Sequence, residues 1–173
     1  AALQACLDAV AQEPDTARFH YQLGRAYSAL RQSDEAIAAY TKARDLGHTR
    51  AWVALGLAIQ SAGARQGGKF EAQASEEVLQ LFARGVDEGD PYAFYALGRD
   101  MMRYGGTTAI EVEGYDLIMR SLEVGHTFAM NELASFYLDE DSEFYDAERG
   151  LRYLRESADR NDIYGYNSLG LAY

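Results

Sequence analysis

The sequence is poor in cysteine and proline. Its 173 residues include one cysteine, Cys6, and two prolines, Pro14 and Pro91. A single cysteine excludes a disulfide within this chain and any metal site built on cysteine pairs, and it leaves open a pairing with a cysteine elsewhere. With so little proline, long helices are allowed almost everywhere. No apolar run approaches the roughly 18 residues of a membrane span, so no membrane insertion is expected.

Basic residues are also scarce. The chain has 16 lysines and arginines against 27 acidic residues, a formal net charge of −11. A surface for nucleic acid or for an anionic membrane needs a basic field, so neither is an expected partner. Hydrophobic residues make up 48% of the chain, which is enough for a core and excludes wholesale disorder.

The sequence lacks the common signatures of enzymes and cofactor sites. It contains no G-x-S-x-G, H-E-x-x-H, P-loop or G-x-G-x-x-G pattern. Cys6 and His20 are a conceivable nucleophile and base, but packing roles account for both residues. The acidic stretch Asp139–Asp146 offers carboxylates to calcium but lacks the glycine of an EF-hand loop, so a solvated loop is expected. We therefore predict no enzyme activity, no metal and no cofactor.

The chain repeats a short Leu-Gly motif in a helical context. Four of the five leucines are followed by glycine and one by alanine, and their spacings are 32, 42, 36 and 36 residues. These leucines are Leu23, Leu55, Leu97, Leu133 and Leu169. An aromatic or aliphatic residue follows each leucine by four places, which puts both on one helical face.

A second helix and a turn follow each motif. Apolar and small residues recur at spacings of three and four, as in Ala36, Ile37, Tyr40 and Ala43. The turns contain Gly47, Gly89, Gly125 and Asn161, which suit a left-handed helix end. Thr49, Asp90 and Thr127 are then predicted N-caps for the next helix. His48 and His126 occupy equivalent turn positions, so they belong to the repeat rather than to a metal cluster.

The small residue after each leucine predicts close packing of two helices. A glycine inside a helix costs about 1 kcal/mol relative to alanine, so its recurrence at one offset implies a packing reason. A single hairpin cannot bury its apolar face alone, and stability then comes from contacts between neighbouring hairpins.

These motifs resemble two related repeat families. The first unit, with Leu23, Gly24, Tyr27, Ala36 and Tyr40, resembles a tetratricopeptide repeat. The later, longer units resemble Sel-1-like repeats, with the pattern A-x-x-x-L-G-x-x-Y. Two features depart from the pattern: an acidic stretch at Asp139–Asp146 replaces the usual glycine-rich loop, and about six extra residues lie around Gly63–Gln73.

The resemblance implies an all-α, right-handed α–α superhelix of about four and a half helical hairpins. It implies one helical-repeat domain over residues 1–173. The expected segments are an N-terminal helix and linker at 1–16, a tetratricopeptide-like unit at 17–48, Sel-1-like units at 49–90, 91–126 and 127–162, and a truncated half-unit at 163–173.

The family pattern also implies a concave groove lined by the first helix of each hairpin. Positions two residues before and two after each conserved leucine, and positions about three and six residues further on, point inward, and residues just before each first helix form the rim. The candidate partner-binding residues are Tyr21, Arg25, Tyr92, Tyr95, Arg99, Arg103, Asn131 and Asn167. In the fourth unit the same pattern selects Ser135 and Leu138. Guanidinium groups grip carboxylates and asparagines hold an extended backbone, which favours a peptide ligand. The alternative is that the arginines only balance neighbouring acids such as Asp100.

The leading hypothesis is a non-enzymatic scaffold or adaptor that binds a peptide or helix of a partner protein in this groove. The alternative is a structural or regulatory segment of a larger protein that packs against a catalytic domain elsewhere. The chain begins without methionine and stops at Tyr173 within a helical pattern, so we expect a piece of a longer protein, with self-association through the C-terminal face as a further hypothesis. The excess of arginine over lysine favours a bacterial source, and the compartment, cytoplasm or periplasm, stays open.

Overall fold

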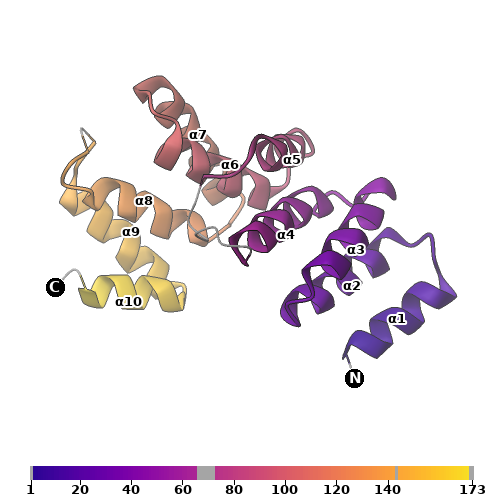
Figure 1. The fold of residues 1–173 in the computed structure, drawn as a ribbon. Coiled ribbons are helices and arrows are strands. Elements are labelled where there is room, and N and C mark those ends of the chain that lie inside the picture. The colour runs from indigo at the N-terminus through magenta and orange to yellow at the C-terminus, as the bar shows by residue number, and fades with distance from the viewer. Residues whose placement is uncertain (1, 66–72, 143, 172–173) are drawn as a thin grey trace. The chain divides into compact units, whose positions relative to one another are not determined.

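The computed structural model describes residues 2–65, 73–142 and 144–171, and this part of the chain forms ten helices and no strand. The helices are α1 Ala2–Gln12, α2 Ala17–Ala29, α3 Ser33–Asp45, α4 Ala51–Arg65, α5 Glu76–Asp87, α6 Pro91–Tyr104, α7 Thr108–Glu123, α8 Phe128–Leu138, α9 Ala147–Asp159 and α10 Ile163–Leu171. After α1, the helices α2 to α9 pair in chain order as four antiparallel hairpins, and α10 follows as a single helix against α9 (Figure 1). Of the longer loop expected at Gly63–Gln73, residues 66–72 lie outside the described part. No helix in the described ranges is both long enough and apolar enough to cross a bilayer.

The helix ends follow the predicted turn chemistry. Gly47, Gly89 and Gly125 have φ values of 86°, 73° and 89°, and Asn161 has a φ of 60°, all in the left-handed region. The Asp90 carboxylate accepts a hydrogen bond from the backbone N–H of Tyr92 at 3.1 Å and caps α6, as predicted. These turns end each hairpin at the expected position.

Two of the predicted N-caps are wrong. Helix α4 begins at Ala51, so Arg50 separates Thr49 from its first residue. Thr127 occupies the N-cap position of α8, but its backbone is already helical (φ −65°, ψ −30°) and its hydroxyl makes no capping bond. A capping side chain needs an extended backbone to reach the first turn. The backbone carbonyls of His126 and Thr127 accept hydrogen bonds from N–H groups of that turn instead.

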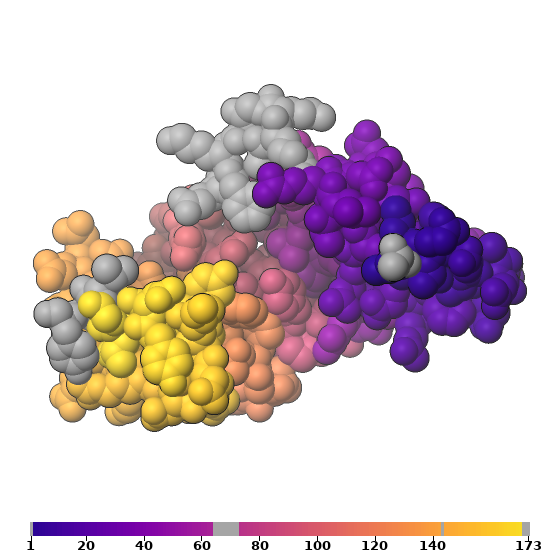
Figure 2. Space-filling view, turned by 90° about the horizontal axis from the view of Figure 1, so that it is seen from below, coloured from indigo at the N-terminus to yellow at the C-terminus, as the bar shows by residue number. Residues whose placement is uncertain are grey.

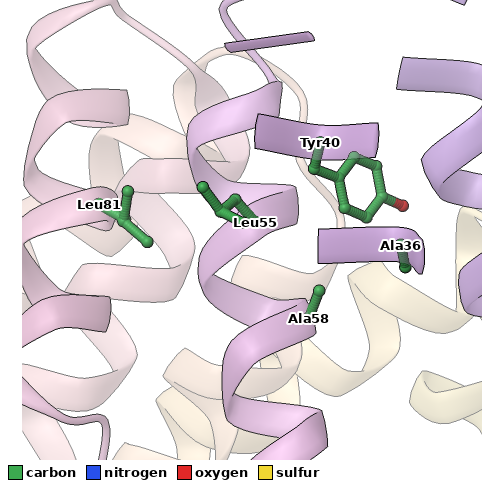
Figure 3. Packing of buried hydrophobic residues seen from close by; sticks show 5 residues of the cluster. All are labelled: Ala36, Tyr40, Leu55, Ala58 and Leu81. Atoms are coloured by element: carbon green, nitrogen blue, oxygen red, sulfur yellow. The ribbon is translucent and has the colours of Figure 1, made fainter. Parts of the chain in front are cut away.

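The chain divides into two compact units, residues 1–93 and 94–173. The core of the first unit joins α3, α4 and α5. Leu55 and Ala58 of α4 lie between Tyr40 and Ala36 on one side and Leu81 on the other (Figure 3). All five side chains are buried, so the hydrophobic effect holds these successive helices together.

Helical glycines allow the close approach within the first unit. A Cβ built on Gly24 would lie 2.5 Å from the ring of Tyr40, and one on Gly56 would lie 2.7 Å from the ring of Phe82. Each aromatic ring of a second helix therefore occupies the space that a side chain after the leucine would take. The packing reason predicted from the Leu-Gly motif is confirmed at these two positions.

The second unit is built in the same way. Its core contains Ile118 of α7 with Ala129 and Leu133 of α8. Gly98 of α6 and Gly114 of α7 face each other so closely that a Cβ on Gly98 would lie 2.7 Å from the Gly114 carbonyl oxygen. Neither position tolerates a side chain without moving a helix.

The linker between α1 and α2 is held by a buried histidine. His20 lies on α2, and its Nε2 donates a hydrogen bond to the Pro14 carbonyl at 2.7 Å. Pro14 separates the two helices as the sequence predicts. The contact gives His20 a structural role in the first unit.

The ten described helices confirm the predicted all-α repeat fold. The handedness of the superhelix and the exact repeat boundaries stay predictions.

Candidate functional site

The second unit contains a cleft of about 710 Å³. Helices α8, α9 and α10 and the loop between α8 and α9 supply its walls. The lining residues are Asn131, Ser135, Leu138, Asp139, Glu140, Tyr145, Ala147, Leu151, Leu154 and Ser168. Its volume lies within the range of about 300–1,000 Å³ that is typical of ligand sites.

Two small residues place the walls of this cleft. A Cβ on Gly150 would lie 2.6 Å from the side chain of Leu138, so α9 packs closely on the end of α8. A Cβ on Gly165 would lie 2.5 Å from the Ser157 hydroxyl, so α10 packs closely on α9. Because α9 packs closely against both α8 and α10, the three helices form one well-packed surface.

Asn131 ties two walls of the cleft together. Its Nδ2 donates a hydrogen bond of 2.9 Å to Oδ2 of Asp162, in the turn before α10. The other carboxylate oxygen of Asp162 accepts a bond of 3.0 Å from the backbone N–H of Tyr164 and caps α10. The amide of Asn131 therefore holds α8 against the start of α10.

The opposite end of the cleft is acidic. Helix α8 ends at Leu138, and Asp139 and Glu140 follow it directly. The Asp139 carboxylate accepts a bond of 3.1 Å from the backbone N–H of Asp141. Within the described residues, neither Asp139 nor Glu140 takes part in an ion pair. The described residues contain no group of three or more His, Cys, Asp or Glu side chains placed to hold a metal, and Glu143 of this loop lies outside them.

The predicted site residues of the first unit make local contacts. The ring of Tyr21 stacks on the imidazole of His48 at 4.2 Å with an interplanar angle of 11°. Arg25 is exposed and donates to the Gln22 side chain at 3.3 Å. Tyr92 is exposed in the first turn of α6. Burial raises the pKa of Tyr21 and lowers the pKa of His48, so the stacked pair is uncharged at neutral pH.

In the second unit, Tyr95 and Arg99 lie together on α6. The Arg99 guanidinium sits 5.5 Å from the Tyr95 ring centroid, and that ring lies 5.1 Å from His126 and 6.4 Å from Phe128. Phe128 in turn lies 5.9 Å from Tyr164. These aromatic side chains form one continuous row across the starts of α8 and α10.

Arg103 is engaged within the fold. Its Nε and Nη2 donate to the two carboxylate oxygens of Glu132 at 2.7 and 3.2 Å. The partner acid is therefore Glu132 on α8, and it lies 29 residues along the chain from Arg103. The alternative, in which an arginine balances an acid, applies to Arg103, and the acid is Glu132 of α8 rather than the neighbouring Asp100.

The same contact between the first helix and the closing turn of a hairpin occurs in three of the repeats. The residue two places before the conserved leucine contacts the residue after the left-handed turn: Tyr21 with His48, Tyr95 with His126, and Asn131 with Asp162. The first two pairs are contacts between aromatic rings, and the third is a hydrogen bond from an amide to a carboxylate. This position therefore links the start of a hairpin to its own end.

The cleft contains only part of the predicted set. Of the eight candidate residues, Asn131 lines it, and Asn167 is exposed elsewhere on α10. Ser135 and Leu138, selected by the same repeat pattern, line it as well. Sequence reasoning missed the contributions of Tyr145, Leu151, Leu154 and Ser168. The departure of the loop from the usual glycine-rich form was the one signal that marked this region.

No protein-family model and no curated protein matches this sequence. Solved structures do match it. A Sel1 repeat protein from Oxalobacter formigenes is similar over 94% of this chain and 65% of its own length, at 22% identity and a TM-score of 0.71. The protective antigen c5321 of uropathogenic Escherichia coli, described as displaying an SLR fold, is similar over 99% of this chain and 36% of its own length, at 20% identity and a TM-score of 0.67.

A third solved structure is YrrB, described as a TPR protein with an unusual peptide-binding site. The similarity covers 96% of this chain and 80% of that one, at 18% identity and a TM-score of 0.54. The chain thus has the all-α repeat-solenoid fold of Sel1 and tetratricopeptide repeat proteins, and the resemblance expected from its motifs is confirmed at the level of the fold. It spans about two thirds and about one third of the length of the first two proteins.

Proposed function

We propose that this chain is a non-enzymatic protein–protein interaction scaffold that holds a short segment of a partner protein in the cleft between α8, α9 and α10. The observation that carries the proposal is the cleft itself. Its lining combines apolar side chains, the amide of Asn131, which is fixed by Asp162, and the acids Asp139 and Glu140. Preformed clefts bind with little ordering cost, which favours recognition of a short peptide.

The comparisons support a binding role of this kind. YrrB, whose fold this chain shares, is described as having a peptide-binding site. Repeat folds present side chains from successive helices along one surface, and a bound segment contacts several of them at once. The proposal transfers this mode of binding to the described cleft.

We propose the remaining predicted groove residues as additional partner contacts. Tyr95 and Arg99, in the same unit as the cleft, are proposed secondary contacts for a longer partner. Tyr21, Arg25 and Tyr92, in the first unit, are proposed contacts of a separate surface. Asn167, exposed on α10, is proposed as a contact beside the cleft. Arg103 is assigned to the fold in this proposal because Glu132 occupies its guanidinium.

A random dodecapeptide library displayed on phage, selected against the whole chain, tests the proposal. Ser135→Trp places an indole in the cleft from an exposed position of α8 and should abolish binding of the selected peptides. Ala38→Trp, at an exposed position of α3, is the matched control and should leave binding unchanged. Circular dichroism of both variants checks that they are folded.

The other outcomes are equally informative. Binding that survives Ser135→Trp but is lost in Arg25→Glu or Arg99→Glu would move the binding surface to the other predicted positions. A selection that yields no specific peptide, with the folded chain on the support, would contradict the scaffold proposal.

A second function, packing against another domain, has one observation in its favour. Helix α10 exposes Ile163, Tyr164 and Tyr166 by 67%, 59% and 53%, and Figure 2 shows the surface of this helix in yellow. Apolar patches of this kind often mark contact surfaces. Ile163→Ser with Tyr166→Ser should then abolish the contact with a neighbouring domain or a second copy, measured by analytical ultracentrifugation, and leave Ser135-dependent peptide binding intact.

A further inference from the structure

The two ends of the cleft differ in chemistry. Asn131, Ser135 and Ser168 are its uncharged polar residues. Asp139 and Glu140 lie at the other end, where α8 stops. Since no cation is among the lining residues, the net charge of the lining is negative, and it is concentrated at the end formed by Asp139 and Glu140.

The negative potential at the acidic end comes from side chains. The helix dipoles add little, because the negative end of α8 at Leu138 and the positive end of α9 at Ala147 both line this part of the cleft. Asp139 and Glu140 add two carboxylates that form no ion pair within the described residues. Such a position favours a cation from outside, because no internal cation must be displaced first.

The neighbouring surface of the cleft suits the body of a basic side chain. Tyr145, half exposed, lines this end of the cleft, and aromatic faces attract guanidinium and ammonium groups. Leu138, Leu151 and Leu154 supply apolar surface, and Leu154 is buried. An aliphatic side chain on those leucines gains contact area while an adjacent basic group reaches the acids.

We infer that the cleft selects partner segments in which a large aliphatic side chain is adjacent to arginine or lysine, with the basic group placed between Asp139, Glu140 and Tyr145. This inference rests on the proposed function, and it names the class of peptide. It differs from the carboxylate-gripping groove expected from Arg25, Arg99 and Arg103, because it assigns the opposite charge to the ligand.

A peptide array tests the inference directly. Each octapeptide carries Leu, Ile or Phe next to Arg, Lys, Gln or Glu in a background of Gly and Ser, and the probe is the whole labelled chain. Peptides with Arg or Lys should bind, those with Gln should bind more weakly, and those with Glu should not bind. Dissociation constants for the best Arg peptide and its Gln counterpart are then measured by fluorescence anisotropy.

Charge-neutralising variants separate charge from shape. Asp139→Asn with Glu140→Gln should raise the dissociation constant of the Arg peptide by about fivefold and leave that of the Gln peptide unchanged. Each partly exposed charge contact contributes only a fraction of a kcal/mol to binding. Asp34→Asn with Glu35→Gln removes the same charge from the first turn of α3 and is the matched control. High salt should weaken binding of the Arg peptide to the wild type but not to the variant without the two charges.

The result also separates this inference from the proposed function. Binding of Glu or Gln peptides that equals binding of Arg peptides, and that is lost in Ser135→Trp, would overturn the inference and leave the scaffold proposal standing. An array without Ser135-dependent binding would also overturn the inference, while the independent phage selection decides the proposed function.

Discussion

Arg103 of α6 holds the carboxylate of Glu132 on α8 with two hydrogen bonds, at 2.7 and 3.2 Å. The Glu132 side chain is only 9% exposed and the Arg103 side chain is 45% exposed. The guanidinium therefore neutralises a charge that would otherwise be buried alone. The pair joins the first helices of two consecutive hairpins in the second unit.

Arg103→Ala should destabilise the chain by about 1–3 kcal/mol, because it leaves the Glu132 carboxylate buried without a partner. The half-exposed guanidinium keeps the effect below that of a fully buried pair. Urea unfolding followed by circular dichroism measures the change. The double variant Arg103→Met with Glu132→Met is the control and should lose less stability than the single variant. Equal losses would mean that packing, and not the unpaired charge, sets the cost.

Gly24→Ala should destabilise the first unit by about 1–3 kcal/mol, since the new Cβ would lie 2.5 Å from the Tyr40 ring. Gly170 occupies the equivalent position of the last repeat and has no atom within 4 Å of a built Cβ. Gly170→Ala should instead be neutral or stabilising by up to about 1 kcal/mol, because alanine favours helix. Thermal unfolding of the two variants makes the comparison. A similar loss in both would show that close packing is not the reason for the glycine.

His48 should titrate below its ordinary pKa of 6.5, because burial against Tyr21 disfavours the imidazolium. The folded state then binds this proton less tightly than the unfolded state, so the free energy of unfolding falls as the pH drops below 6.5. Tyr21→Leu exposes the ring and should raise the pKa toward its ordinary value, measured by NMR titration. His48→Gln identifies the signal. An unchanged pKa in Tyr21→Leu would show that the stacked ring does not cause the shift.

Tyr115 should ionise well above the ordinary tyrosine pKa of 10. Burial and the hydrogen bond with Tyr137 raise its pKa to about 12. The folded state holds this proton more tightly than the unfolded state, so the free energy of unfolding decreases as the pH rises above 10. Spectrophotometric titration of the wild type should show a component near 12 that Tyr115→Phe removes. Retention of that component in the variant would assign it to another tyrosine.

Local repetition made most of the fold predictable from the sequence. The Leu-Gly motif, the small turn residues and the apolar spacing each recur, so four or five copies support one interpretation. The contacts of Gly24 with Tyr40 and of Gly56 with Phe82 explain why the motif recurs. The left-handed turns at Gly47 and Asn161 follow from residue type alone.

The candidate site depends on features that do not repeat. The bond between Asn131 and Asp162 and the ion pair of Arg103 with Glu132 join residues 31 and 29 positions apart, and no spacing rule selects one acid over its neighbours. The acidic end of the cleft comes from the one loop that departs from the family pattern. Sequence reasoning therefore chose arginines as the charged contacts, whereas the cleft carries acids.

NMR of the labelled whole chain with the tightest peptide from the random selection locates the binding site directly. Chemical-shift changes are expected at Asn131, including its side-chain amide, and at Ser135, Leu151 and Ser168, and none are expected at Arg25 or Tyr21. Changes confined to the first unit, or to positions outside the cleft in the second, would contradict the assignment of this cleft as the binding site.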